Sequence, residues 1–123
     1  MNKKKFTYIT ALTLLSFTLM TGCTNERREN QPAYRQIGIN AMESGDYAGA
    51  VDAFNSALGQ CIGKITENEL DICYYKAAAQ YAGGDSAGAV DTYTAIIDYD
   101  KKAADAYYLR GCVYLKQGNT EGA

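Results

Sequence analysis

The sequence contains no histidine and only one proline. Without histidine, the most common general base is missing and the usual Ser-His-Asp and Cys-His catalytic sets cannot form. A zinc site would have to use cysteine and carboxylate ligands alone, and no CxxC pair is present. No glycine-rich loop stands between a strand and a helix, as phosphate binding would need. The sequence therefore predicts no catalytic residue, no cofactor and no metal site.

The first 22 residues have the pattern of a removable export signal. Three lysines at positions 3–5 precede Phe6–Met20, an uncharged stretch rich in Leu, Phe, Ile and Thr. This stretch is too short to cross a bilayer, which takes about 20 residues. A buried N-terminal helix is the alternative, but the lysines and the polar residues that follow Gly22 argue against it. We therefore expect residues 1–22 to be a signal peptide.

The signal ends in Leu19-Met20-Thr21-Gly22-Cys23. This motif resembles the bacterial lipobox, although Met20 stands where that family prefers leucine. The resemblance implies that Cys23 is lipidated and holds the chain to the cell membrane or outer membrane, on its extracytoplasmic side. Residues 23–31 would then be the lipidated cysteine and a polar tether. Eight extended residues reach at most about 29 Å, so the folded part would stay close to the membrane.

The charge and the remaining cysteines limit the partners and the chemistry. Without residues 1–22, the chain has 9 basic and 14 acidic side chains and a net charge of −5. An acidic surface repels nucleic acid and anionic lipid, so we expect neither as a partner. Export is compatible with a disulfide between Cys61 and Cys73. We favour the alternative that these two and Cys112 are small apolar residues at helix contacts.

A six-residue pattern, Gly-[Asp/Asn]-x-x-Gly-Ala, occurs three times, at residues 45–50, 84–89 and 118–123. Internal repeats with spacings of 39 and 34 residues indicate stacked supersecondary units. The first glycine can adopt the left-handed conformation that ends a helix. The following Asp or Asn can cap the next helix, and the small alanine lets two helices approach. Each copy therefore predicts the turn of a helical hairpin.

The segments beside these turns have helical patterns. We expect helices over Ala33–Ser44, Asp71–Ala82 and Ala104–Gln117 before the turns, and over Tyr47–Gly59 and Ser86–Tyr99 after the first two. In the last two segments apolar residues recur at three- and four-residue steps, which places them on one helical face. Strict alternation of the kind found in strands is rare. The clustered acids Glu67, Glu69 and Asp71 we interpret as a solvated loop.

Together these features resemble tetratricopeptide repeats, which are 34-residue helix-turn-helix units. The matching residues are Tyr34, Gly38, Gly45, Tyr47, Ala50, Phe54 and Ala57 in the first unit, Tyr74, Ala77, Tyr81, Gly84, Ala89 and Tyr93 in the second, and Tyr107, Gly111, Tyr114, Gly118 and Ala123 in the third. Ala41 departs from the family pattern, and the second unit fits only if one residue is missing near Gly83. The resemblance covers residues 32–123. It implies an all-α, right-handed superhelical stack of antiparallel helix pairs with about two and a half repeats, the last one truncated.

The resemblance also implies a role in protein binding. Six tyrosines at repeat positions are expected in the core: Tyr34, Tyr74, Tyr81, Tyr93, Tyr107 and Tyr114. The residues expected to line a concave groove are Arg35, Ile39, Met42, Tyr75, Lys76, Ala79, Tyr108, Leu109, Cys112 and Lys116. Such a groove suits an extended peptide or a partner's helix, so we expect a membrane-anchored interaction module or scaffold at the cell envelope and no enzyme. Two alternatives remain: the N-terminal arm of a longer exported enzyme, and a surface-anchored lipoprotein that binds carbohydrate.

Overall fold

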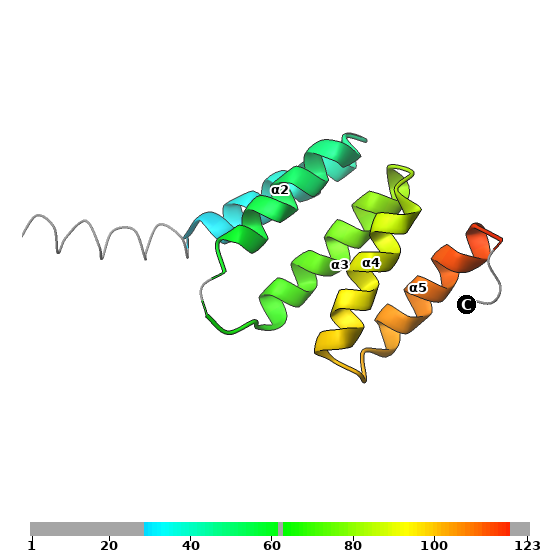
Figure 1. Cartoon of the computed structure of the whole chain (residues 1–123). Coiled ribbons are helices and arrows are strands. Elements are labelled where there is room, and N and C mark those ends of the chain that lie inside the picture. Colours follow the sequence, from blue (N-terminus) through cyan, green and yellow to red (C-terminus); the bar gives the residue numbers. More distant parts are fainter. Residues whose placement is uncertain (1–28, 62, 119–123) are drawn as a thin grey trace, which may run out of the picture.

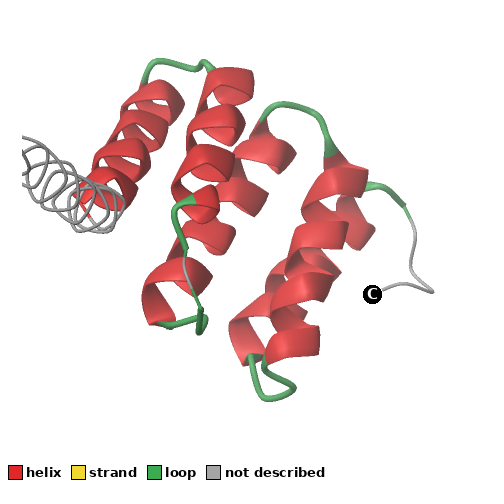
Figure 2. Ribbon diagram, turned by 60° about the vertical axis from the view of Figure 1, so that its left-hand side comes forward, coloured by secondary structure: helices red, strands yellow, loops and turns green. Residues whose placement is uncertain are grey.

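The computed structural model describes residues 29–61 and 63–118, and within these residues it contains helices and no strand. A first helix covers residues 29–43. It is followed by α2 (Tyr47–Gly59), α3 (Glu67–Ala82), α4 (Ser86–Tyr99) and α5 (Ala104–Lys116). The helices stack in chain order, with the first helix at one end and α5 at the other (Figure 1), and short loops join them (Figure 2). The predicted all-α, tetratricopeptide-like stack is confirmed.

The first two predicted turns share one hydrogen-bonded geometry. In the first, Gly45 has a φ of +79°, and the N–H of Asp46 donates to the carbonyl oxygen of Ala41 at 2.9 Å. The Asp46 carboxylate then accepts the N–H of Gly49 at 2.9 Å and caps α2. The second turn repeats all of these contacts 39 residues further on. Gly118, with a φ of +75°, follows α5 in the same way, while Asn119 and Ala123 lie outside the described residues.

The loop predicted from the clustered acids is instead the start of α3. This helix begins at Glu67 rather than at Asp71 because Thr66 caps it. The hydroxyl of Thr66 accepts the N–H of Asn68, while the Glu69 carboxylate accepts the N–H of Thr66 at 2.7 Å and also its hydroxyl proton. This reciprocal arrangement is a capping box, and its Thr-x-x-Glu signature is visible in the sequence.

The first helix also begins earlier than expected, since residues 29–31 of the predicted tether are helical. The Gln31 amide donates to the carbonyl oxygen of Ala57 at 3.3 Å and to the carboxylate of Glu69 at 3.2 Å. These bonds tie the first helix to α2 and α3. Burial alone would raise the pKa of Glu69, but the hydrogen bonds from Thr66 and Gln31 outweigh it and lower the pKa to about 2.

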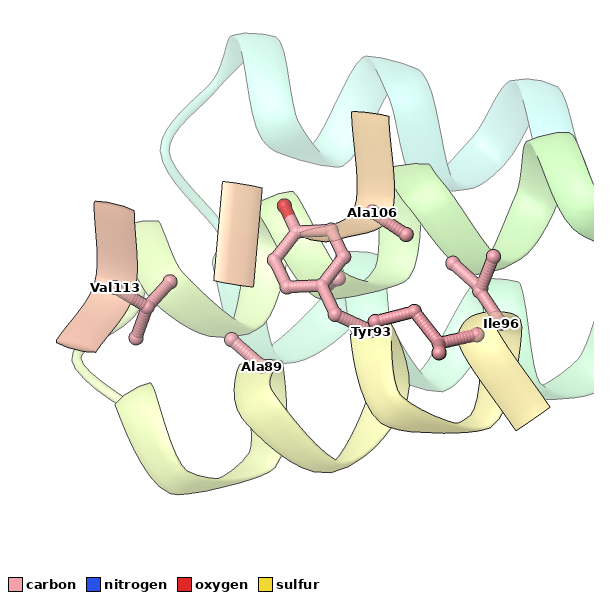
Figure 3. Close-up of a cluster of buried hydrophobic side chains, with 7 residues drawn as sticks. Ala89, Tyr93, Ile96, Ala106 and Val113 are labelled. Atoms are coloured by element: carbon pink, nitrogen blue, oxygen red, sulfur yellow. The ribbon is translucent and has the colours of Figure 1, made fainter. Parts of the chain in front are cut away.

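Two clusters of buried apolar side chains hold the stack together. The first core cluster consists of Ala50, Phe54, Ala57, Ile72 and Ala79 and joins α2 to α3. The second core cluster consists of Ala77, Ala89, Tyr93, Ile96, Ile97, Ala106 and Val113 and joins α3, α4 and α5. Figure 3 shows the side chains of α4 in this cluster beside Ala106 and Val113 of α5. As predicted, the motif alanines Ala50 and Ala89 are fully buried where helices meet.

The six tyrosines expected in the core differ in burial. Tyr93 is buried, and Tyr34, Tyr74 and Tyr114 are partly buried. The prediction is wrong for Tyr81, which is 37% exposed, and for Tyr107, which is 44% exposed. At the surface, the ring of Tyr107 lies 5.5 Å from the Arg110 guanidinium.

Candidate protein-binding groove

A hollow of about 360 Å³ lies between the first helix and α3. It is lined by Gln31, Pro32, Arg35, Asn68, Asp71 and Ile72. The first helix and α3 are the leading helices of the first two pairs, from which the sequence predicts the concave groove. Polar and apolar side chains are mixed in this lining, and the amide and charged groups can bond to a peptide backbone.

An ion pair links the two helices beside this hollow. Nε and Nη2 of Arg35 lie 2.8 and 2.7 Å from the Asp71 carboxylate, and these side chains are 34% and 48% exposed. The guanidinium also lies 4.9 Å from the ring centroid of Tyr75, at the distance of a cation–π contact. Because the pair is partly exposed, it contributes at most about 1 kcal/mol to stability. Its main effect is to fix the position of Arg35 in the groove.

Tyr75 has a different surrounding from the one predicted. Its ring stacks on Phe54 with the centroids 5.8 Å apart and the planes inclined by 25°. It is partly buried and packs on the first core cluster. Tyr75 therefore connects α3 to α2, and only part of its side chain remains free for a partner.

Several other predicted groove residues belong to the core. Ala79 is fully buried, which corrects its assignment to the groove. Ile39 and Met42 are partly buried against the first core cluster, and Leu109 against the second. Their side chains are used for packing between helices, so they can offer a partner only their edges.

Three of the remaining predicted residues, Tyr108, Cys112 and Lys116, are exposed, with Tyr108 at 71%. The fourth, Lys76, is partly buried. The three exposed residues follow one another at four-residue steps along α5, so they form one stripe on that helix. This stripe, called the α5 stripe below, offers a partner an aromatic ring, a thiol and a cation.

The core contacts give the register that relates the two complete units. A Cβ on Gly38 would lie 2.4 Å from the ring of Phe54, 16 positions later, and Ala77 shares a core cluster with Tyr93, also 16 positions later. The units are therefore 39 positions apart from Gly38 onward, and the predicted missing residue near Gly83 is not needed.

In this register Tyr74, rather than Tyr75, corresponds to Arg35. Both side chains reach toward the first turns of the next leading helix: Arg35 bonds to Asp71, and Asp105 adds to burial in raising the pKa of Tyr74. Tyr108 stands 34 positions after Tyr74, in the corresponding place of α5.

No helix in the described ranges is both long and apolar enough to cross a membrane. Within the same ranges, no three Cys, Asp or Glu side chains are grouped to bind a metal ion. Cys61 and Cys73 are partly buried free thiols, and Cys112 is an exposed one. Cys23, the predicted lipidation site, lies outside the described residues.

Comparison with known proteins points in the same direction as the fold. Residues 73–103, which span most of α3 and all of α4, match the tetratricopeptide repeat family model. The chain is also 27% identical over 114 residues to the Photosystem I assembly protein Ycf3 of Synechococcus sp. (strain CC9311). That match covers 85% of this chain and 63% of the relative, so the chain spans less than two thirds of the relative's length. Fold and comparisons together describe a tetratricopeptide-like protein.

Proposed function

We propose that the chain is a protein-interaction module that acts as an assembly scaffold, with the partner lying along the leading helices. The observation behind this proposal is the combination of the hollow at Arg35 and Asp71 with the exposed α5 stripe on the same set of helices. The relative with an assembly role in its name supports a scaffold rather than an enzyme.

The occupant that suits these residues is an extended peptide or a helix of a partner protein. Tyr108 supplies a large, rigid contact area, and tyrosine is enriched among the residues that dominate interface energies. Arg35 is held in place by Asp71 and Tyr75, so little side-chain entropy is lost when a partner contacts it.

Replacing Tyr108 with alanine tests the groove. We expect Y108A to weaken binding to a partner recovered by pull-down by roughly 2 kcal/mol, the size typical of an interface hot spot, while stability stays within about 0.5 kcal/mol, as is usual for an exposed side chain. The control is Y99A, because Tyr99 is a tyrosine on α4 that is 51% exposed. Its hydroxyl donates to the Ile65 carbonyl at 3.1 Å, so the stability of both variants is measured before their affinities are compared. Equal affinity of Y108A and the native chain would remove α5 from the proposed groove.

We further propose that a lipid on Cys23 holds this module at the outer face of a cell membrane or at an outer membrane. Support comes from the lipobox-like motif, which ends in Cys23 shortly after the uncharged stretch Phe6–Met20. The test is the mass of the chain made in a bacterial host. We expect a diacylglycerol on Cys23 of the native chain. The C23S variant should lack this lipid and should no longer associate with the membrane. An unmodified Cys23 would refute the anchor but would not affect the proposed groove.

A further inference from the structure

A second hollow, of about 270 Å³, opens between α2 and the turn that joins α3 to α4. Its walls include Tyr47, Ala48, Val51 and Asp52 of α2, Gln80 of α3 and Asp85 of the turn. It shares no lining residue with the hollow of the groove. We call it the α2 hollow.

The α2 hollow has an apolar wall and two carboxylates, with no lysine or arginine in its lining. Tyr47 and Val51 are partly buried and supply the apolar wall. Asp85 is engaged by the backbone N–H of Gly88, as the cap of α4. In the described part of the chain, the ion pairs involve other carboxylates, so no lysine or arginine nitrogen lies within 4 Å of the Asp52 or Asp85 carboxylate.

The charged residues that line the hollow, Asp52 and Asp85, have a single sign. The segments 46–60 and 85–92, which comprise α2 with its caps and the first turns of α4, contain four aspartates and no lysine or arginine. Of the basic residues in the described helices, Lys76 lies one turn before Gln80 on α3 and is not part of the lining, and the others lie on the first helix and α5. When charges of one sign line a recess with apolar walls, the electrostatic potential is strongest in the recess, and it attracts groups of the opposite charge.

We infer that the α2 hollow receives a lysine or arginine side chain from a basic segment of a partner protein. The aliphatic stem of such a side chain packs along Val51 and Tyr47, as long cationic side chains do on apolar surfaces. Its charged head then meets the carboxylates of Asp52 and Asp85, and the Tyr47 ring adds an aromatic face for the cation. An apolar occupant would remove water from both carboxylates without pairing either of them.

This surface is separate from the proposed groove, so the chain would hold two partners, or two parts of one, at the same time. Charge complementarity of this type acts mainly on the rate of encounter and on the choice of partner. A basic partner is therefore expected to associate faster at low ionic strength, because exposed charges are screened beyond about 8 Å at physiological salt.

The test uses the full chain in a neutral detergent and an acetylated octapeptide of alternating lysine and serine as the probe. The control peptide has glutamine in place of each lysine. We expect the lysine peptide to bind, the glutamine peptide not to bind, and D52N to weaken the binding about fivefold, which is the upper end for one exposed ion pair. E67Q is the matched control, because Glu67 is an exposed acid at the opposite end of α3 from Gln80, and it should change affinity less than twofold.

A second variant distinguishes binding in the α2 hollow from general electrostatic attraction to an acidic surface. A48F fills the α2 hollow while it keeps the net charge, and the exposed position of Ala48 makes the substitution compatible with folding. We expect A48F to lose binding at least as much as D52N, with unchanged helical circular dichroism. Three results would each overturn the inference. The A48F variant could bind the lysine peptide as tightly as the native chain, D52N and E67Q could lose the same amount of affinity, or the lysine peptide could fail to bind the native chain.

Discussion

The buried ring of Phe54 fills the space beside Gly38, where a Cβ would lie 2.4 Å from its Cε1 atom. The ring has no exposed surface and cannot move away without disturbing the first core cluster. We therefore expect Gly38→Ala to lower the free energy of unfolding by about 1–3 kcal/mol, the usual cost of overpacking a core. Urea unfolding followed by circular dichroism measures the change.

The control for this substitution is Gly59→Ala. Gly59 is the last residue of α2, and a Cβ there would meet no atom within 4 Å. Because alanine is favoured over glycine in a helix, G59A should be neutral or stabilise by up to about 1 kcal/mol. If both variants behaved alike, the close contact of Gly38 with Phe54 would have no energetic role.

Thr66 gives a second test, because it forms the capping box that starts α3 before the clustered acids. Removing its hydroxyl in T66A should cost about 1 kcal/mol of stability, as for other helix caps. T66S keeps the hydroxyl and should retain most of that energy. A T66A chain as stable as the native one would show that the capping box does not stabilise the start of α3.

The acid sensitivity of the fold should depend on Glu69. Its folded pKa of about 2 lies below the ordinary value of 4.5, so its ionised form stabilises the fold at pH values above 4.5. This contribution is lost as the pH falls from 4.5 toward 2. We expect the stability difference between the native chain and E69Q to be constant above pH 5 and to shrink below it, as measured by urea unfolding. A difference that grew on acidification would contradict the assigned pKa.

The turns and the first residues of α2 and α4 were predictable because they depend on local chemistry. A left-handed glycine followed by an aspartate cap gives the same backbone geometry at Gly45 and Gly84, whatever surrounds it. The start of α3 was predictable in the same way from Thr66 and Glu69. A cluster of acids usually indicates a solvated loop, but Glu69 is buried here and its carboxylate accepts hydrogen bonds from Thr66 and Gln31.

The groove was less predictable because its lining depends on how neighbouring units pack. Matching the aromatic residues of the units placed Tyr75 one position away from its true equivalent. Matching the small residues gives the correct register, because Gly38 faces the ring of Phe54 and Ala77 shares a core cluster with Tyr93. The burial of Ala79 likewise comes from its contact with α2, and no property of α3 alone indicates it.

The three described cysteines should differ in their reaction with iodoacetamide. Cys112 is exposed. Burial raises the pKa of both Cys61 and Cys73, and at Cys73 this effect outweighs the opposing charge of Lys76. Since the thiolate is the reacting form, Cys112 should be alkylated first at pH 8, as followed by peptide mass spectrometry. Unfolding in urea without a reductant should then make all three equally reactive; if Cys61 and Cys73 still resisted, they would be joined in a disulfide rather than packed as free thiols.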